Sequence, residues 1–476
     1  MKELIALLDG HIVGRVTQKA GKLTFSYDEA WRSMPGAYPL STSMSLFIKQ
    51  HSHSSIEPFL WGLLPDNELV LQTWAKKFQV SPRSAFDLIA NVGEDCAGAI
   101  QFVLPERLEE LMGRTGDNAV EWLNATDIEA RLRHLRENAA SGRTPKDTGQ
   151  FSLAGAQPKT ALYFHNDKWG IPSGRVPTTH IFKPPTGDFD GFAENEHLCL
   201  SVARALGLPT AKSEILQFGK ETAIVVERYD RQRVTDLIEA RLKRAEQMEG
   251  RAAEQLAAGD EDGAIQTRMQ AMRLHDQAKG MYETSRVSVL RVHQEDYCQA
   301  LGVHPADKYQ NMGGPSPQDI IEHLRVFSAK PETDVLRFVD ALIFNWLIGG
   351  TDAHAKNYSI LIGSGRSVRL APLYDIASIL AYPDIDPRKA KLAMKVGDAY
   401  KLSKATMAEW IKFSDSIKLS SEIVLNRIGV LAETLPDALS SEVTKLQKTG
   451  LDHPIIPLLQ ATLSERATTI SKTVTK

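Results

Sequence analysis

The stretch "LIGGTDAHAKNYSIL" (residues 347–361) places a carboxylate, a histidine, a lysine and a carboxamide between two apolar runs. The residues before it, "FVDALIFNWLIGG", predict a mostly buried helix, and "YSILIG" predicts a short strand. The polar residues therefore lie on a connection between two core elements, which is where a rigid scaffold usually presents functional groups.

Asp352 and Asn357 lie in this connection, and Asp375 follows in "LYDIAS", just after a β-type run. Phosphoryl transfer from ATP needs a group that orients or deprotonates the attacking hydroxyl, and it needs oxygen ligands for Mg²⁺. Protein kinases meet both needs with an Asp-x-x-x-x-Asn loop followed by a metal-binding Asp. The pattern predicts Asp352 as the base and Asn357 and Asp375 as Mg²⁺ ligands, although this spacing alone arises often by chance.

A kinase also needs a lysine on a strand and a loop that covers the phosphates. "HIFKPP" puts Lys183 near the end of a β-type run, and Glu196 on the following helix is a candidate ion-pair partner; a solvated helix face is the alternative. "FSLAGAQPKTALYF" predicts two strands joined by a turn of small residues, whose N–H groups can face phosphates, or else a plain hairpin. "VVERYDR" follows the last strand of this region, and its Glu227 and Tyr229 are candidates for the hinge that meets adenine.

The bulk composition limits the class of protein. A chain of 476 residues with 42% hydrophobic content is expected to form two or more lobes, and a net charge of −3 gives no global case for nucleic acid or anionic membrane binding. Three scattered cysteines indicate neither a disulfide framework nor a zinc site, which fits a reducing compartment. Without a signal-peptide layout or a membrane-spanning apolar run, the sequence predicts a soluble cytoplasmic protein.

The predicted fold class is α+β, with short strands near the N-terminus and mostly helices near the C-terminus. Five regions are expected: a β-rich N-terminal subdomain (1–105), a helical connector (106–148) ending in "SGRTPKDTG", an α+β nucleotide lobe (149–232), an inserted helical hairpin (233–288) and a largely helical lobe (289–476).

The region 233–288 is rich in Ala, Glu, Arg, Gln and Met, and its apolar positions recur at helical spacing on both sides of "AAGDEDG". This pattern predicts two helices joined by a turn. Two such helices bury little apolar area between themselves, so the stripe through Ile265, Met269 and Met272 is expected to need another protein surface. A solvated or partly disordered spacer is the alternative.

Several motifs in order, "FSLAGAQPKTAL", "PTTHIFKP", "ENEHLCLSVARALGL", "VVERYDR", "HQEDYCQALG", "KYQNMGGPS", "WLIGGTDAHAKNYSILI" and "LAPLYDIAS", resemble the HipA family of toxin serine/threonine kinases. The resemblance includes the N-terminal blocks "WGLLPDN" and "VGEDCAGAI" and is broken mainly by 233–288. It implies a two-lobed kinase-like fold with an appended N-terminal subdomain, and ATP and Mg²⁺ as cofactors. It also implies a helix-turn-helix antitoxin of the HipB type and an aminoacyl-tRNA synthetase target, often the glutamyl enzyme. Operator DNA is expected to be met mainly through the antitoxin.

By position, the resemblance implies that Asp352 is the proton acceptor and that Asn357 and Asp375 hold Mg²⁺. Nucleotide contacts are implied for Ala154, Gly155, Ala156, Gln157, Pro158, Lys159, Lys183, Glu227, Arg228, Tyr229, His354, Asn357, Tyr374 and Asp375. Ser152 matches the autophosphorylated serine of the family, and a phosphate beside the ATP phosphates would repel them and pull the loop from its place.

Two other functions remain open at this point. One is a small-molecule kinase of related fold, which only the resemblance separates from a protein kinase. The other is a pseudokinase that acts as a scaffold or co-repressor. The presence of Lys183, Asp352, Asn357 and Asp375 together argues against the pseudokinase.

Overall fold

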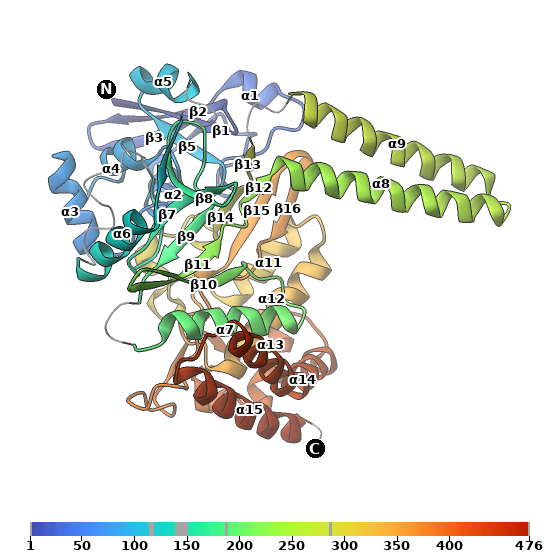
Figure 1. Cartoon of the computed structure of the whole chain (residues 1–476). Helices are drawn as coiled ribbons and strands as arrows, with labels where there is room; N and C mark the ends of the chain where they lie inside the picture. Colours follow the sequence, from blue (N-terminus) through green and yellow to red (C-terminus); the bar gives the residue numbers. More distant parts are fainter. Residues whose placement is uncertain (1, 114–118, 139–150, 186–188, 285–287, 475–476) are drawn as a thin grey trace.

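The computed structural model describes residues 2–113, 119–138, 151–185, 189–284 and 288–474. Figure 1 shows two sheets side by side, a helical lobe at the C-terminal end and a pair of long helices that project from the body. Strands and helices are mixed throughout, and the α+β class predicted from the sequence is confirmed. Within the described residues, no helix is both long and apolar enough to cross a membrane.

The N-terminal part is built on a five-stranded sheet in the order β4-β3-β2-β1-β5, in which each pair is antiparallel. One face carries a core that includes Phe25, Phe59 and Phe86, while α5 covers Ile5 and Leu7 on the other face. The elements are β1 (Lys2–Leu8), β2 (His11–Lys19), β3 (Lys22–Tyr27), α1 (Glu29–Ser33), β4 (Gln50–His51), α2 (His53–Gly62), α3 (Glu68–Phe78), α4 (Ala85–Val92), β5 (Ile100–Val103) and α5 (Leu108–Gly113).

The second sheet has six antiparallel strands in the order β10-β11-β9-β7-β8-β6. Helix α6 packs against β10 and β11, and α7 packs against the same two strands. The elements are β6 (Val120–Leu123), α6 (Ala125–Glu137), β7 (Thr160–His165), β8 (Lys168–Pro172), β9 (His180–Lys183), α7 (Phe192–Ala205), β10 (Ser213–Phe218) and β11 (Glu221–Glu227).

The stretch expected as a helical connector, 106–148, contributes a strand and a helix to this second sheet. Strand β6 pairs with β8, and Ile128 and Leu132 of α6 are buried in one core with Leu162 and Phe182. The four-residue spacing of these apolar side chains gives α6 a face that fits the sheet. The expected boundary motif "SGRTPKDTG" (141–149) lies outside the described residues.

The C-terminal lobe packs helices around α12, which is buried on nearly all sides by α11, α14 and α15. Its strands form a three-stranded sheet, β14-β15-β16, and the hairpin β17-β18. The elements are β14 (His293–Asp296), α10 (Tyr297–Ala300), α11 (Pro317–Phe327), α12 (Pro331–Ile348), β15 (Ser359–Gly363), β16 (Ser367–Leu370), β17 (Lys391–Val396), β18 (Ala399–Lys401), α13 (Met407–Ser416), α14 (Ser421–Lys448) and α15 (Ile455–Val474).

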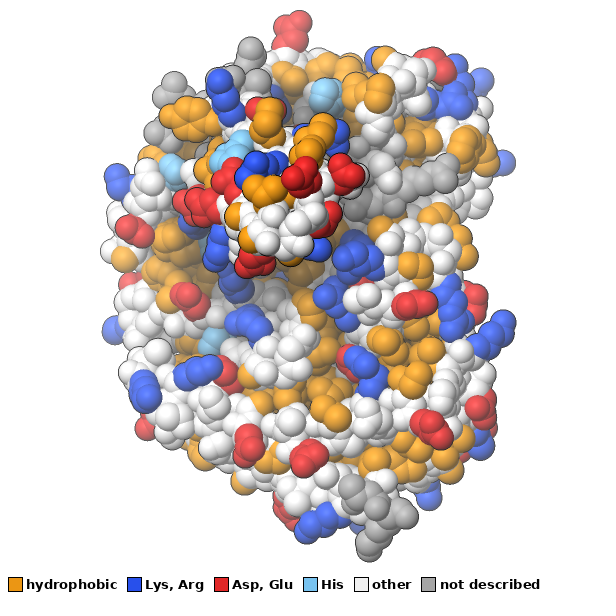
Figure 2. Space-filling view, turned by 90° about the vertical axis from the view of Figure 1, so that its right-hand side faces the viewer, with side chains coloured by type: hydrophobic (Ala, Val, Ile, Leu, Met, Phe, Trp, Pro, Cys, Tyr) orange, Lys and Arg blue, Asp and Glu red, His pale blue; other side chains and the backbone are white. Residues whose placement is uncertain are grey.

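The projecting pair consists of α8 (Val234–Ala257) and α9 (Glu261–Thr284), which run antiparallel on a stem formed by β12 (Arg231–Arg233) and β13 (Val289–Arg291). Alanines recur every seven residues along the seam between the helices and are almost fully buried: Ala245, Ala252, Ala264, Ala271 and Ala278. Small side chains at these positions let the two backbones approach closely. The stripe of Ile265, Met269 and Met272 is more than half exposed on the outer surface, and Figure 2 looks along the hairpin from its free end.

Candidate active site

The loop after α12 presents Asp352. Helix α12 ends at Ile348, and the next residue, Gly349, turns the chain sharply with a φ of 68°. The short helix η5 (Ala355–Asn357) follows before β15. Asn357 Nδ2 donates a hydrogen bond of 2.8 Å to the backbone oxygen of Asp352, which fixes the two ends of the loop to each other. The Asp352 side chain is 71% exposed, so its carboxylate is accessible to an incoming substrate.

Two aromatic side chains brace the Asp352 carboxylate. Tyr309 donates a 2.7 Å hydrogen bond from its hydroxyl to Asp352 Oδ1. His354 is buried edge-to-face against the Tyr309 ring, with ring centres 5.0 Å apart. Burial lowers the pKa of His354, so its imidazole stays neutral near pH 7. This position fits a bracing role for His354 better than that of a general base.

Lys183 joins the second sheet to the C-terminal lobe. Its Nζ donates to Glu196 Oε1 at 2.7 Å and to Asp375 Oδ1 at 2.8 Å, so the predicted pair with Glu196 is confirmed. Burial alone would lower the pKa of Lys183, but the charges of Asp375 and Glu196 outweigh it and raise the pKa above its ordinary value. In return, Lys183 holds the pKa of Asp375 well below its ordinary range although burial opposes this. Lys183 and Asp375 are therefore both charged near neutral pH.

A chain of contacts connects Asp375 to the Asp352 loop. The hydroxyl of Tyr374, the residue before Asp375, donates a 2.7 Å hydrogen bond to the backbone oxygen of Lys356 and lies 2.6 Å from Ser359 Oγ. Lys356 directly precedes Asn357 in the loop. The structure therefore brings together Lys183, Tyr374, Asp375, Asn357 and Asp352, which the sequence distributes over 193 positions.

The turn of small residues lies between the second sheet and the N-terminal subdomain. Gly155 has a φ of 102°, and a Cβ there would lie 2.6 Å from Lys159 Nζ, so a larger residue would be strained. Lys159 Nζ donates a hydrogen bond of 2.8 Å to the backbone oxygen of Ala154. Burial and the charge of Lys183 lower the pKa of Lys159 to about 8. Gln157 and Pro158 line a narrow space with Trp74 of α3.

Ser152 is fully buried at this junction. Its hydroxyl donates a 2.6 Å hydrogen bond to the backbone oxygen of Leu63, and its N–H donates to the backbone oxygen of Asp95 at 3.0 Å. Both acceptors belong to the N-terminal subdomain. The Ser152 hydroxyl therefore reaches solvent only if the segment separates from that subdomain.

The three predicted hinge residues have different environments. Glu227 ends β11 and lies 3.4 Å from Lys212 at the surface. Tyr229 donates a hydrogen bond to Gln294, and its ring lies 5.8 Å from that of Tyr374. The Arg228 guanidinium is buried and donates to Asp230 and to the backbone oxygen of Cys96, so a contact of this residue with a nucleotide would have to be made by its backbone.

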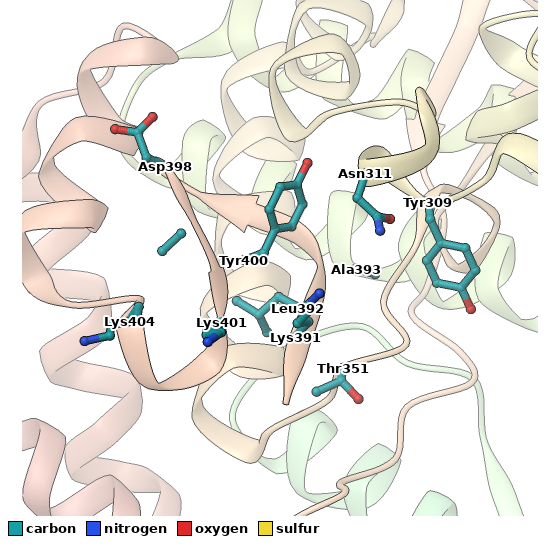
Figure 3. A pocket seen from close by; sticks show the side chains of 11 residues that line it. Tyr309, Asn311, Thr351, Lys391, Leu392, Ala393, Asp398, Tyr400, Lys401 and Lys404 are labelled. Carbon is teal, nitrogen blue, oxygen red and sulfur yellow. The ribbon is translucent and has the colours of Figure 1, made fainter. Parts of the chain in front are cut away.

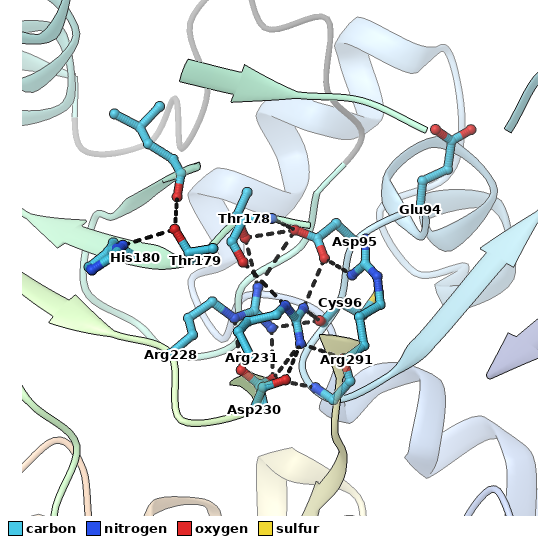
Figure 4. Close-up of polar contacts among 12 residues, drawn as sticks. Glu94, Asp95, Cys96, Thr178, Thr179, His180, Arg228, Asp230, Arg231 and Arg291 are labelled. Atoms are coloured by element: carbon cyan, nitrogen blue, oxygen red, sulfur yellow. Dashed lines mark hydrogen bonds and ion pairs between the residues drawn. The ribbon is translucent and has the colours of Figure 1, made fainter. Parts of the chain in front are cut away.

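Arg228 belongs to a buried ionic cluster that joins the N-terminal subdomain, the hinge after β11 and the strand β13 (Figure 4). Asp95 of the N-terminal subdomain accepts hydrogen bonds from Arg231 at 2.9 Å and from Arg291 of β13. Burial alone would raise the pKa of Asp95, but Arg291 and Arg231 hold it below its ordinary value. The cluster fixes the hinge to the block "VGEDCAGAI" of the N-terminal subdomain. The sequence points to this role of the block only through the two acidic residues inside an apolar run.

Sequence reasoning also missed Asp66 in "WGLLPDN". Its carboxylate accepts hydrogen bonds from Lys356 of the Asp352 loop and from Lys308, and its N–H donates 3.2 Å to the backbone oxygen of Gly155. Asp66 thus contacts both the turn of small residues and the loop that bears Asp352. Nothing in its local sequence distinguishes it from an ordinary turn aspartate.

The donor atoms near Asp375 suit a hard divalent cation. Because Asn357 Nδ2 is bound to Asp352, its carboxamide oxygen is the atom left to coordinate an ion. Asp375 uses Oδ1 for Lys183, which leaves Oδ2 as a second oxygen donor. One carboxylate and one carboxamide oxygen fit Mg²⁺, which usually keeps several waters and binds few protein ligands.

Known protein families match both the N-terminal subdomain and the rest of this architecture. The family model of the HipA-like C-terminal domain matches residues 151–439, and that of the HipA N-terminal domain matches residues 4–103. The protein Y4mE of Sinorhizobium fredii is 35% identical over 91% of this chain and 90% of its own length. The serine/threonine-protein kinase toxin HipA of Shewanella oneidensis is 27% identical over 91% of this chain and 88% of its own length.

One solved structure shares the fold over nearly the whole chain. It is that of Shewanella oneidensis HipA in a complex with HipB and operator DNA. The match has a TM-score of 0.74 at 22% identity, and it covers 98% of this chain and 97% of that one. The expected two-lobed architecture with an appended N-terminal subdomain is thereby confirmed.

Proposed function

The chain belongs to the HipA family, and from this membership we propose that it is an ATP- and Mg²⁺-dependent serine/threonine protein kinase that acts as a toxin. The observation that carries the proposal is the position of Lys183 between Glu196 and Asp375. The neighbouring residue Tyr374 donates a hydrogen bond to the loop that bears Asp352 and Asn357. Kinases need this lysine–glutamate pair and the metal-binding aspartate in place together.

In this reaction the hydroxyl oxygen of a serine or threonine attacks the γ-phosphorus of ATP. The new O–P bond forms as the bond to the β,γ-bridging oxygen breaks, ADP leaves, and Asp352 accepts the hydroxyl proton. Tyr309 occupies Asp352 Oδ1, which leaves Oδ2 to accept the hydroxyl proton. Lys183 and Lys159 supply positive charge for the phosphates, and Asn357 and Asp375 would hold Mg²⁺, which supplies charge neutralisation when bound.

The proposal includes control through Ser152. In this structure its hydroxyl is buried against Leu63, so the 151–159 segment must leave its place before the serine can accept a phosphate. A phosphate of about −1.5 to −2 charge cannot return to this apolar position without a large desolvation cost. Phosphorylation would therefore keep the turn away from the nucleotide and inhibit the enzyme.

We propose partners on the basis of family membership. A HipB-like antitoxin is expected to neutralise the kinase and to provide most of the contact with operator DNA, as the complex of the Shewanella oneidensis protein suggests. An aminoacyl-tRNA synthetase, with the glutamyl enzyme favoured, is the proposed target. With such a target, the proposed location of the protein is the cytoplasm.

Radiolabelled ATP provides the test. The wild-type protein with Mg²⁺ is expected to incorporate phosphate into Ser152, and Asp352→Asn should reduce incorporation at least about 100-fold because an amide cannot accept the proton. Asp375→Asn should weaken Mg²⁺-dependent ATP binding, whereas Asp352→Asn should retain it. Asp384→Asn, an exposed residue, is the matched control.

Each contrary result has a distinct meaning. Full incorporation by Asp352→Asn would remove this residue from the mechanism. ATP turnover without protein phosphorylation would favour a small-molecule kinase. A wild-type protein without any turnover would favour the pseudokinase.

A further inference from the structure

A pocket of about 520 Å³ lies beside the loop that carries Asp352 (Figure 3). One wall is the segment with Tyr309 and Asn311, the opposite wall is the β17-β18 hairpin, and Thr351 lies at the base. Tyr309 belongs both to this pocket and to the hydrogen bond with Asp352. The pocket is therefore lined by the residue before the proposed catalytic carboxylate and by its hydrogen-bond partner.

Three lysines make the pocket strongly basic: Lys391, Lys401 and Lys404. Lys391 and Lys401 are directly opposite each other in the antiparallel β17-β18 pair, and all three side chains are exposed. Like charges at opposed positions destabilise a strand pair. No ion pair between these lysines and an acid occurs in the described parts of the chain, so their mutual repulsion is not relieved within the protein.

The acidic residue in the lining does not neutralise them. Asp398 lies at the turn of the hairpin, where its carboxylate is 3.1 Å from Lys412 of α13. Its N–H donates to Glu409 of the same helix. The negative charge of Asp398 is thus shared with a lysine outside the pocket.

The walls of the pocket are fixed to each other. Gln310 Oε1 accepts a 2.8 Å hydrogen bond from the N–H of Lys395, which ties the Tyr309 segment to β17. The N–H of Leu402 donates to the backbone oxygen of Ala390, which closes the other end of the hairpin. The backbone of the hairpin that carries the lysines is therefore held against the Tyr309 segment without a bound substrate.

We propose that this pocket binds an acidic stretch of the protein substrate, adjacent to the serine or threonine that Asp352 serves. The proposal rests on the proposed kinase function and adds to it a substrate class. An anionic segment relieves the repulsion between Lys391 and Lys401, and its position next to Asp352 orients the acceptor hydroxyl. The size of the pocket suits a few side chains rather than a nucleic-acid duplex.

Peptide binding by the full-length protein tests the proposal without catalysis. The probes are a fluorescein-labelled decapeptide with a central serine and four glutamates, the same peptide with four glutamines, the same with four lysines, and a ten-nucleotide RNA. Fluorescence anisotropy in the presence of Mg²⁺ and a non-hydrolysable ATP analogue gives the affinities. The glutamate peptide is expected to bind at least about tenfold more tightly than the glutamine peptide, with an affinity that falls as salt rises.

Substitutions assign the binding to the pocket. Lys391→Ala with Lys401→Ala should weaken glutamate-peptide binding at least about fivefold, because each exposed ion pair contributes up to about 1 kcal/mol. Lys389→Ala with Lys448→Ala removes the same charge from exposed positions outside the pocket and should leave binding unchanged. Lys391→Glu with Lys401→Glu should transfer the preference to the lysine peptide, a gain that an unfolded variant cannot show.

The contrary outcomes are specific. Equal binding of the glutamate and glutamine peptides, or equal loss in both alanine variants, overturns the proposal. RNA binding that is tighter than glutamate-peptide binding and depends on the same lysines would assign the pocket to nucleic acid instead. Wild-type autophosphorylation is measured in parallel, so a failure of the proposed kinase function is recognised separately from a failure of peptide binding.

Discussion

Lys356 of the Asp352 loop places its Nζ 2.5 Å from Oδ1 of Asp66, a residue of the N-terminal subdomain 290 positions away in the sequence. Lys308 contributes a second hydrogen bond of 2.7 Å to the same carboxylate. Burial alone would raise the pKa of Asp66, but the two lysines outweigh it and lower the pKa. The N-terminal subdomain therefore holds the loop that bears Asp352 in place through the carboxylate of Asp66.

Asp66→Asn is expected to destabilise the protein and to reduce autophosphorylation. The substitution leaves the two lysines without their counter-charge, and Lys356 has only 4% of its side chain exposed, so a cost of roughly 3–5 kcal/mol is expected. Thermal unfolding at pH 7 measures the loss. Because the folded-state pKa of Asp66 is depressed, this stability is present above the unfolded-state pKa of the carboxyl and disappears as the pH falls.

A matched variant separates this effect from a general loss of charge. Asp66→Glu keeps the charge but displaces the carboxylate by one methylene, and it should recover part of the stability and less of the activity. An Asp66→Asn protein with unchanged melting temperature and unchanged autophosphorylation would show that the contact has no role in positioning the loop.

The pKa of Lys159 predicts a pH dependence of ATP binding. Burial and the nearby charge of Lys183 lower the pKa of Lys159 to about 8, so Lys159 loses its positive charge as the pH rises through this value. ATP affinity should therefore fall about three- to tenfold between pH 7 and pH 9. In the ATP-free protein, the depressed pKa means that charged Lys159 is less favourable in the folded state than in the unfolded state. This destabilisation is complete at low pH and diminishes as the pH rises above about 8, because Lys159 then loses its proton in the folded state first.

Titration of a fluorescent ATP analogue at several pH values measures this dependence. Lys159→Met should bind ATP weakly at all of them, with a flat profile from pH 7 to pH 9. Lys168→Met, at an exposed position of β8, is the control and should retain the wild-type profile. If the Lys159→Met protein keeps the same slope as the wild type, another group is responsible for the pH dependence.

Patterns local in sequence predicted much of the fold and part of the site. The apolar runs around 347–361 form α12 and β15, as predicted. The contact between Lys183 and Glu196 was also predicted, because the two residues are only 13 positions apart, on a strand and on the helix that follows it. The direct bond from Lys183 to Asp375 spans 192 positions. No periodicity or spacing encodes such a contact, which is determined by how the two lobes pack.

The features that the sequence did not reveal depend on tertiary context. The bond from the Arg228 guanidinium to the buried carboxylate of Asp230 cannot be read from the hinge-like motif. Strand β6 is short, with partly exposed side chains, and it pairs with β8 at the edge of the second sheet. The apolar stripe of α9 was expected to need another protein surface and is exposed here, whereas the seam of buried alanines was not foreseen.

Phosphorylation of Ser152 is expected to release the 151–159 segment. The structure gives the Ser152 hydroxyl a carbonyl partner at 2.6 Å and no exposed surface, so a phosphate group cannot be accommodated there. Hydrogen exchange should show faster exchange at 151–159 in the phosphorylated protein than in Ser152→Ala. ATP affinity should be at least about tenfold lower in the phosphorylated form because charge and displacement both oppose binding. Equal exchange and equal affinity in the two forms would contradict this mechanism.

The last prediction concerns the hairpin of α8 and α9. The seam of alanines is internal to the two helices, and the stem pairs Arg231 with Arg291 and Arg233 with Val289 below it. The hairpin is therefore expected to fold on this stem as a separate unit. Replacement of residues 236–284 by a short Gly/Ser linker should leave autophosphorylation within about twofold of wild type, since loop length alone changes stability only slightly.

A second variant tests the seam itself. Ala271→Leu inserts a larger side chain into a position that is 1% exposed, and overpacking of this kind typically costs about 1–3 kcal/mol. This variant should lose helical content by circular dichroism on mild heating, before the main unfolding transition, whereas Met272→Leu on the exposed side should not. If the linker variant is folded but has lost autophosphorylation, the hairpin is part of the catalytic unit; if Ala271→Leu lowers the main transition instead, the hairpin and the body unfold together.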